Sequence, residues 1–396
     1  MSVEISSRVR SLMRMTMADM ADLADARPGA FRLENADTCL APPDHVLEAT
    51  RSSVGVDRCN SYLPLRGLPE LREAIAHRYR ADFGLEYDPE GEVVVTSGAG
   101  ESLLNALLAT IDPGDRVLIT NPTYSGMAQR VRLAGGEQVF LDLREGERWT
   151  FDLDEARARA QGCRAVFFAS PCMPTGTVFT EEETRVLAEA AVENDAVVVF
   201  NAHADRVAFG GRRVVHPATL PGLRERTLVV GCVSKSWNMP GWRVGWTLAP
   251  RELASALEDT HIFNGIMPGG FSQAGAAAAL AGPQAWQREA VAFYEENAAA
   301  LVAELRASPR LRVVPPEGGY YFLADVEATG LDAFRFAERL LAEEDVAVTP
   351  MAGWGSDDFG RFAVRLIFTN EPRERIVEAG RRIAAFADRV AGERRG

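Results

Sequence analysis

Between Glu92 and about Pro250 the chain alternates short apolar runs with helical stretches, and this alternation constrains the fold more than any other feature of the sequence. The apolar runs are rich in β-branched residues and are predicted to be strands, with amphipathic helices between several of them. This alternation predicts an α/β domain with a mostly parallel central sheet and helices on both faces. Ligands of such domains bind where strands end and loops begin. The predicted strands are Glu92–Thr96, Arg116–Thr120, Glu137–Leu141, Ala165–Ala169, Ala196–Phe200, Thr227–Gly231 and Val244–Ala249, and the helices include Glu101–Thr110, Tyr124–Ala134 and Glu181–Asn194.

The pattern changes after Pro283, where a second, smaller α+β domain is expected. We predict a large α/β domain over residues 46–284 and a small domain over 285–396. Residues 1–45 contain three prolines and are expected to run as an arm that joins the small domain. The elements predicted in the small domain are a long helix over Ala285–Ala307, strands near Leu311–Val314 and Tyr320–Ala324, a helix over Asp332–Glu343, another strand pair and a final helix over Glu374–Val390.

Composition excludes several classes of protein. The chain has 396 residues with a net charge of -13, which argues against a general nucleic-acid binder because such proteins carry a basic stripe. The N-terminus, Met1 to Arg14, has no apolar core of signal-peptide length, and no stretch approaches the length of apolar residues needed to span a membrane. The five cysteines are scattered and form neither a CxxC pair nor a Cys/His cluster, so we expect a reduced, cytoplasmic protein without a structural metal site.

The sequence contains a single lysine, Lys235, although lysine and arginine together number 43. On a surface the two residues often replace each other. They cannot do so where the chemistry needs an amine, because a guanidinium stays protonated and is a poor nucleophile. Chance survival on the surface explains most lone lysines, so the neighbouring residues decide between a surface and a chemical role.

Lys235 lies in the segment Cys232-Val-Ser-Lys-Ser-Trp-Asn-Met-Pro-Gly-Trp-Arg243-Val-Gly, directly after a predicted strand. The segment resembles the S-x-S-K…G-x-R-x-G signature of fold-type I enzymes that depend on pyridoxal 5′-phosphate (PLP), specifically the class I and II aminotransferases. The resemblance implies that Lys235 forms the internal aldimine and later moves the α-proton, and that Arg243 clamps the cofactor phosphate. A bidentate guanidinium suits phosphate. Cys232 replaces the first serine, so one phosphate-binding hydroxyl is expected to be missing.

Two further segments fit the same resemblance. The run Val-Val-Val-Thr-Ser-Gly-Ala99-Gly100-Glu predicts a strand, a glycine turn and a helix start, whose free backbone amides suit a phosphate. A dinucleotide fingerprint is the alternative, but it would need glycine at Leu103. The resemblance assigns the amides of Ala99 and Gly100 to the PLP phosphate. It places Tyr124, after the next strand, against the pyridine ring, where a packed loop tyrosine is the plainer alternative.

The resemblance also implies a shared site in a homodimer and a site for an amino-acid carboxylate. Tyr62 begins a Y…G…LR element whose tyrosine reaches the phosphate of the neighbouring subunit. Arg365, in the run Phe-Ala-Val-Arg-Leu-Ile, corresponds to the arginine that binds the substrate α-carboxylate, and Ala36 in the N-terminal arm is assigned to the same site. The resemblance extends from about Leu33 to Ile383, with its motifs in family order.

The pattern departs from the family at the cofactor ring. In the segment Ser170–Gly176, Met173 replaces the asparagine that hydrogen-bonds the phenolic oxygen, and methionine is a weak acceptor. Asn201 replaces the aspartate of a D-E-x-Y motif, which keeps the pyridine nitrogen protonated, and Ala204 replaces its tyrosine. Asp205 is an alternative candidate for the aspartate, but it lies well past the strand end.

These departures weaken the electron sink, because a neutral amide cannot favour the pyridinium as a nearby carboxylate does. Transamination, which reprotonates the carbanion at the cofactor, should suffer more than β-elimination or decarboxylation. Met173 and Ala204 should also enlarge the pocket, and a glycine-rich loop is expected to do the same, through Gly265, Gly269 and Gly270.

Two hypotheses for the function therefore stay open. One is an ordinary aminotransferase that tolerates the substitutions. The other is a non-transaminating PLP enzyme, catalysing β-elimination or oxidative or decarboxylative deamination of a bulky amino-acid conjugate in specialised metabolism. A non-enzymatic regulator is disfavoured, because the acidic chain has no room for a DNA-binding module before Pro43 and keeps its only lysine in the signature.

Overall fold

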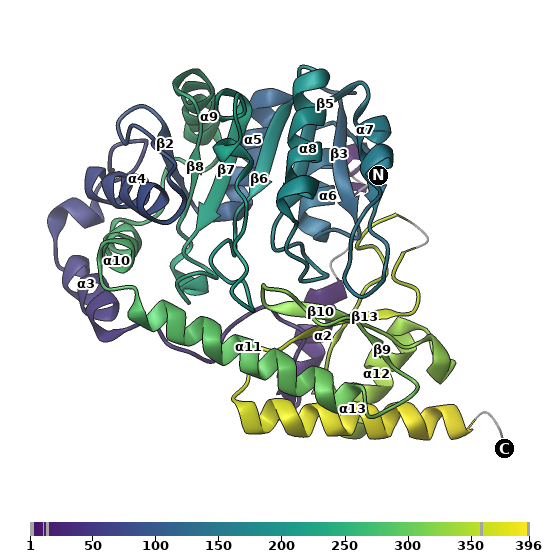
Figure 1. Cartoon of the computed structure of the whole chain (residues 1–396). Coiled ribbons are helices and arrows are strands. Elements are labelled where there is room, and N and C mark those ends of the chain that lie inside the picture. Colours follow the sequence, from purple (N-terminus) through teal and green to yellow (C-terminus); the bar gives the residue numbers. More distant parts are fainter. Residues whose placement is uncertain (1–3, 11, 13–15, 357–358, 394–396) are drawn as a thin grey trace.

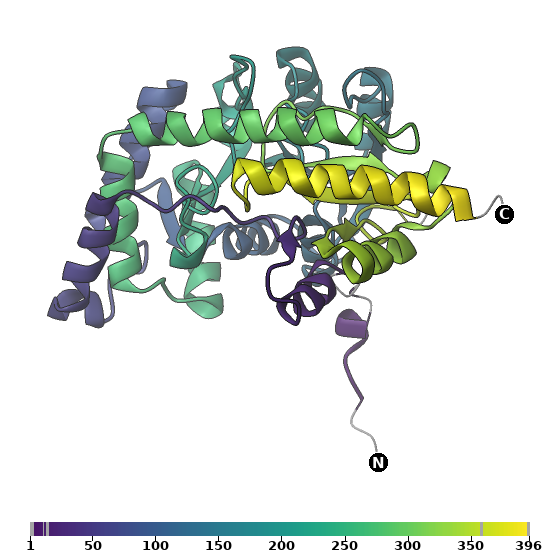
Figure 2. The ribbon, with the colours of Figure 1, turned by 90° about the horizontal axis from the view of Figure 1, so that it is seen from below.

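The computed structural model describes residues 4–10, 12, 16–356 and 359–393. A large sheet covered by helices stands above a smaller sheet and two long helices, α11 (Ala285–Leu305) and α13 (Arg373–Glu393) (Figure 1). Seen from below, α11 and α13 run side by side across the molecule (Figure 2).

The large sheet has seven strands in the described part of the chain, in the order β2-β8-β7-β6-β5-β3-β4. β8 is antiparallel to its neighbours β2 and β7, and all other neighbouring pairs are parallel. The strands are β2 (Val93–Thr96), β3 (Arg116–Asn121), β4 (Glu137–Asp142), β5 (Cys163–Ala169), β6 (Val197–Asn201), β7 (Thr227–Cys232) and β8 (Gly245–Leu248).

Both faces of this sheet are buried, which explains why its strands are almost continuously apolar. Along β6, Val199 belongs to a core on one face with residues of α5, α6 and α9, whereas Val198 and Phe200 belong to the opposite core with residues of α4, α7 and α8. The helices are α4 (Pro69–Phe83), α5 (Ala99–Thr110), α6 (Ser125–Leu133), α7 (Leu153–Ala160), α8 (Glu181–Glu193) and α9 (Arg251–Asn264).

The smaller sheet is antiparallel, in the order β12-β13-β10-β9. The N-terminal strand β1 (Phe31–Arg32) pairs in parallel with β11 (Val346–Ala347), so the first part of the chain lies against the C-terminal part. The remaining elements of this region are α2 (Thr16–Asp25), β9 (Arg312–Val313), β10 (Tyr321–Asp325), α12 (Ala333–Glu344), β12 (Thr349–Pro350) and β13 (Ala363–Ile367).

Two helices that the strand pattern does not predict, α3 (Asp44–Val54) and α10 (Gly270–Ala281), pack against each other, and α10 also packs on α4. They lie on the outer side of β2 and β8 (Figure 1). The short helices of the chain are α1 (Ser7–Arg10), η1 (Asp57–Asn60), η2 (Pro217–Thr219), η3 (Arg224–Arg226), η4 (Pro240–Trp242) and η5 (Glu327–Thr329).

The predicted fold class, a mostly parallel α/β sheet with helices on both faces and a smaller α+β part, is confirmed. Predicted ends of elements move by one to three residues. One shift matters for the site, because β6 continues through Asn201 instead of ending at Phe200. None of the helices in the described residues is long and apolar enough to span a membrane.

Candidate active site

Lys235 lies in the turn that follows β7, where that strand faces the smaller sheet. Its side chain is half-buried, and Nζ donates a hydrogen bond to the Ala36 carbonyl of the N-terminal segment. The Tyr320 hydroxyl donates to the Lys235 carbonyl at 2.7 Å, and Nζ lies 5.1 Å from the centre of the Tyr320 ring. Lys235 therefore touches all three parts of the chain that surround the site.

Burial lowers the pKa of Lys235 from 10.5 to about 8, and the charges of Arg365 and Arg243 act in the same direction. Cys232 and Asp37 oppose this effect but do not reverse it. A substantial fraction of the amine is consequently neutral near pH 8, and a neutral amine is a nucleophile.

A second part of the site is the turn between β2 and α5. Gly98 has φ +84°, and a Cβ at this position would lie 2.6 Å from an Nη of Arg243. A Cβ at Gly245 would similarly lie 2.5 Å from the Ala99 amide nitrogen. The two glycines thus let the exposed Arg243 lie beside the N-terminus of α5, where the Ala99 and Gly100 amides begin the helix. An arginine beside free helix amides is a favourable place for a phosphate.

Glu101 holds this turn in place. It accepts a hydrogen bond from the Ser97 backbone amide at 2.6 Å, and its other carboxylate oxygen lies 2.5 Å from Nδ1 of the buried His261. Burial opposes ionisation of Glu101, but the His261 and Ser97 hydrogen bonds outweigh it and hold the Glu101 pKa below its usual value.

Asn201 forms the end of β6, and its amide is 4% exposed. Nδ2 lies 3.6 Å from the Met127 sulfur, whereas Oδ1 has no hydrogen-bond partner among the described residues. A buried amide oxygen without a hydrogen-bond partner costs free energy, so a polar group of a ligand would be favoured at this position.

Two neighbours of this pocket come from other loops. Met173 is buried and follows β5, and Tyr124 is half-buried directly before α6. The Tyr124 ring lies against Gly126, where any Cβ would collide with it, and it packs at 5.8 Å from the Trp354 ring.

Arg365 on β13 is 1% exposed, and no Asp or Glu in the described ranges forms an ion pair with it. Its Nη2 donates to the Glu34 carbonyl at 2.5 Å, its guanidinium lies 4.6 Å from the centre of the Trp354 ring, and its Nε has no hydrogen-bond partner among the residues described. Burial lowers the pKa of Arg365 to about 10. A buried cation without an anion suits the carboxylate of a ligand.

Three more residues considered from the sequence differ in exposure and contacts. Tyr62 is 86% exposed in this single chain. Cys232 is buried at the end of β7, where its thiol is directed to the His203 carbonyl at 3.9 Å. Asp205, the alternative to Asn201, is buried in an ion pair with Arg206 at 2.9 Å.

Whether the glycine-rich loop enlarges the pocket of a neighbouring subunit stays a prediction, since the single chain shows only how the loop packs within one copy. A Cβ at Gly265 would collide with the Glu101 carboxylate, and one at Gly270 would lie 2.5 Å from the Cys59 carbonyl oxygen. These glycines allow close packing of the chain. Gly269 meets only the Phe271 ring, at 3.3 Å.

Sequence reasoning missed three residues of the site, His203, Tyr320 and Tyr321. His203 Nε2 lies 2.7 Å from the Tyr321 hydroxyl, and both side chains are buried. Proximity in sequence was an available signal, because His203 follows Asn201 by two residues.

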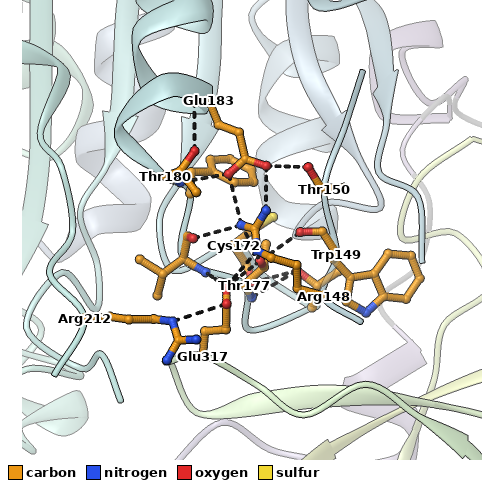
Figure 3. A network of polar contacts seen from close by, with 12 residues as sticks. Arg148, Trp149, Thr150, Cys172, Thr177, Thr180, Glu183, Arg212 and Glu317 are labelled. Carbon is orange, nitrogen blue, oxygen red and sulfur yellow. Dashed lines mark hydrogen bonds and ion pairs between the residues drawn. The ribbon is translucent and has the colours of Figure 1, made fainter. Parts of the chain in front are cut away.

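A network of polar contacts joins the loop that carries Met173 to the turn before β10 (Figure 3). Glu317 accepts hydrogen bonds from the Thr177 hydroxyl at 2.9 Å and the Val178 amide at 3.0 Å. It also pairs with Arg148 at 3.3 Å and with Arg212 at 3.2 Å, and Arg148 pairs in turn with Glu183 at 2.7 Å. The network fixes Tyr320 and Tyr321 relative to the large sheet.

Comparison with known proteins agrees with this geometry. The family model "Aminotransferase class I and II" matches residues 29–379. The aspartate aminotransferase of Bacillus subtilis (strain 168) is 30% identical over 84% of this chain and 87% of its own length, and that of Rhizobium meliloti (strain 1021) is 32% identical over 88% and 87%. The solved structure of N-succinyldiaminopimelate aminotransferase from Mycobacterium tuberculosis superposes with a TM-score of 0.91 at 30% identity, covering 97% of this chain and all of that one. The chain therefore belongs to the class I and II aminotransferase family of PLP-dependent enzymes.

Proposed function

We propose that this enzyme transforms an amino acid with a free α-carboxylate and that Lys235 binds PLP covalently through its amine. The observation that supports the proposal is that the only lysine, with a pKa of about 8, lies close enough to Arg243 and to the buried Arg365 for both charges to lower its pKa, while Arg365 forms no ion pair with a carboxylate in the described residues. One reactive amine would therefore be within reach of both the site proposed for the phosphate and the site proposed for the carboxylate.

The residues present fit the cofactor. Arg243 and the amides of Ala99 and Gly100 would hold its phosphate, and the side-chain amide of Asn201, whose oxygen has no hydrogen-bond partner among the described residues, would meet its pyridine nitrogen. Tyr124 would pack on the ring. When bound, PLP supplies an electron sink for the carbanion that forms at the substrate α-carbon.

The protein residues would bind the substrate and transfer the proton. Arg365 orients the substrate by its carboxylate, with Ala36 beside it, and the Lys235 amine takes the α-proton and returns it. Met173 and Cys232 line the cofactor without the hydrogen bonds that asparagine and serine would give. We assign residues 46–284 to the large domain, residues 285–396 to the small domain and residues 1–45 to the arm that joins it.

A homodimer with shared sites is part of the proposal. Tyr62, 86% exposed, and Phe263, 92% exposed, are large apolar residues on the surface of the single chain, and Ile266 and Phe271 are also exposed. A second copy that covers them would bring the Tyr62 hydroxyl to the partner's phosphate site. A solution mass near that of one 43.1 kDa chain would contradict this part. The five cysteines are all free, which supports a reducing, cytoplasmic compartment.

A non-transaminating reaction is the second candidate, and the buried neutral amide of Asn201 favours it. The test is to mix the yellow protein anaerobically with amino acids and amino-acid conjugates and to identify the cofactor form. Pyridoxamine phosphate with release of a keto acid would establish transamination. Aldehyde cofactor that persists while substrate is consumed would establish the second candidate. Failure of Lys235→Ala to abolish covalent PLP attachment would overturn the proposal.

A further inference from the structure

His203 and Tyr321 form a buried polar pair across the site. His203 lies in the loop after β6 and is 7% exposed, and Tyr321 begins β10 and is fully buried. The imidazole Nε2 and the hydroxyl oxygen are 2.7 Å apart, and the two rings are tilted by only 17°. The pair therefore links the large sheet to the small one.

The protonation of the pair follows from its burial. Burial raises the pKa of Tyr321 well above 10, so its hydroxyl keeps its proton. Burial also lowers the pKa of His203 to about 4, and the Lys235 charge acts in the same direction against smaller effects of Asn201 and Asp205. Near neutral pH both groups are consequently uncharged.

The neutral imidazole has one N–H, and its position depends on which group of the pair donates. His203 Nε2 is the one hydrogen-bond partner of the Tyr321 hydroxyl within the described residues, and we take the hydroxyl, which keeps its proton, as the donor to Nε2. The ring proton then lies on Nδ1. This atom is buried and has no hydrogen-bond partner in the described part of the chain. Apart from an interaction of the imidazole with the Asn201 backbone, this buried N–H donor has no acceptor in the described part of the chain.

The pair faces the part of the site where an acceptor is expected. Tyr321 lies on the same face of the small sheet as Arg365, since Leu323 is paired directly with Arg365 and strand side chains alternate. The Lys235 charge acts on His203. Bound PLP would carry its phenolic oxygen on the ring carbon next to the one that bears the aldehyde carbon, so this oxygen would lie near Lys235.

We propose that His203 donates its Nδ1–H to the phenolic oxygen of bound PLP, with Tyr321 as the positioning residue that fixes the imidazole. The assignment rests on the proposed function. It gives the oxygen a donor that neither Met173 nor Ala204 can supply, since a thioether and a methyl group have no proton to donate.

The experiment measures the pH midpoint of the visible absorbance of the cofactor in the holoenzyme without substrate. A donor to the phenolic oxygen weakens the hold of that oxygen on the proton of the Lys235 nitrogen and lowers the midpoint. His203→Leu is expected to raise the midpoint by about one to two pH units, the range for a hydrogen bond to a charged group. Tyr321→Phe should shift it in the same direction, and His203→Gln, which keeps an N–H, should restore part of the wild-type value.

Tyr79→Phe is the matched control, because it removes the hydroxyl of another fully buried tyrosine outside the site. It should leave the midpoint unchanged. An unshifted midpoint in both His203→Leu and Tyr321→Phe, with cofactor bound, would overturn the assignment, even if the substrate KM rises, which would place the acceptor on the substrate. An equal shift in Tyr79→Phe would also overturn it. A wild-type protein without cofactor absorbance would instead defeat the proposed function.

Discussion

Lys235 and Arg365 are both cations in buried surroundings, and neither forms an ion pair with a carboxylate in the described part of the chain. This shared property defines the site at the scale of residues. Desolvation disfavours charge on both groups. For the amine the result is a pKa of about 8, so that about a quarter of it is neutral at pH 7.5. The Arg365 guanidinium has a pKa of about 10, so it stays charged near neutral pH and favours the binding of an anion.

The pH dependence of amine reactivity tests Lys235 directly. In cofactor-free protein, the rate of acetylation of Lys235 should rise with pH and level off with a midpoint near 8 rather than 10.5. The sign follows because the deprotonated amine is the nucleophile and burial favours that form. Mass spectrometry of the Lys235 peptide measures the rate. A midpoint at the ordinary value would show that the amine is not desolvated.

Replacement of Arg365 should weaken recognition of the substrate carboxylate. For Arg365→Lys we expect kcat/KM for the amino acid to fall about a hundredfold, because an ammonium cannot replace a bidentate guanidinium. The matching amino-acid amide, which lacks the negative charge, should lose far less. Steady-state kinetics with both substrates provides the comparison. Equal losses for the acid and the amide would contradict carboxylate binding.

Asn201→Asp should move the reaction toward transamination. A carboxylate at the end of β6 favours a protonated pyridine nitrogen, so we expect the ratio of pyridoxamine phosphate to other products to rise about tenfold or more. Chromatography of the cofactor after one turnover measures this ratio. Asn201→Ala removes the amide without adding charge and should not raise the ratio. An unchanged product ratio in Asn201→Asp would remove the main support for a specialised reaction.

At the scale of elements, the site depends on where β2 meets α5. The positive φ of Gly98 and the approach of Arg243 both require glycine at this turn, and Glu101 ties the Ser97 amide to His261 on α9. The phosphate-type site is therefore built jointly by two helices and the antiparallel strand β8.

Gly98→Ala should lower the affinity for PLP about tenfold, because the new methyl group displaces the Arg243 guanidinium. Gly84→Ala is the control. Gly84 also has a positive φ, +69°, but nothing lies within 4 Å of its Cβ position. Fluorescence titration of cofactor-free protein with PLP measures the affinity. A similar loss in both variants would indicate backbone strain instead of displacement of Arg243.

The elements of the large sheet could be predicted because strands buried on both faces are continuous apolar runs, as in β6. Helices α3 and α10 could not. α10 is rich in alanine and glycine and has few polar residues to mark an outer face. Glycine is required at Gly275 because a Cβ there would collide with the side chains of Thr50 and Trp242, which are distant in sequence. The same limit applies to the site. Lys235, Arg243 and Arg365 follow motifs, whereas the pairing of His203 with Tyr321 depends on contact between two sheets.

At the scale of the whole molecule, the large and small parts meet through the Glu317 network as well as through the site (Figure 3). Glu317 lies close in sequence to Tyr320 and Tyr321, and it contacts the loop that carries Met173. Movement of one part relative to the other would consequently reposition both walls of the pocket.

Glu317→Gln should lower the free energy of unfolding by about 1–2 kcal/mol, because it weakens a partly buried carboxylate that pairs with two arginines. Urea denaturation measures the change. Asp325→Asn, which weakens an exposed pair with Arg312, is the control and should cost about 0.5 kcal/mol or less. Equal effects of the two substitutions would mean that the network adds nothing beyond a surface ion pair.

The single lysine also determines where a lysine-specific protease can cleave the folded chain. An enzyme that cuts only after lysine has one peptide bond to cleave, between Lys235 and Ser236, in a turn where both neighbouring side chains, Ser234 and Ser236, are buried. Cleavage needs that turn to unfold locally. The rate at which two fragments appear, residues 1–235 and 236–396, would therefore measure how often the turn that carries Lys235 opens, with no other lysine to contribute.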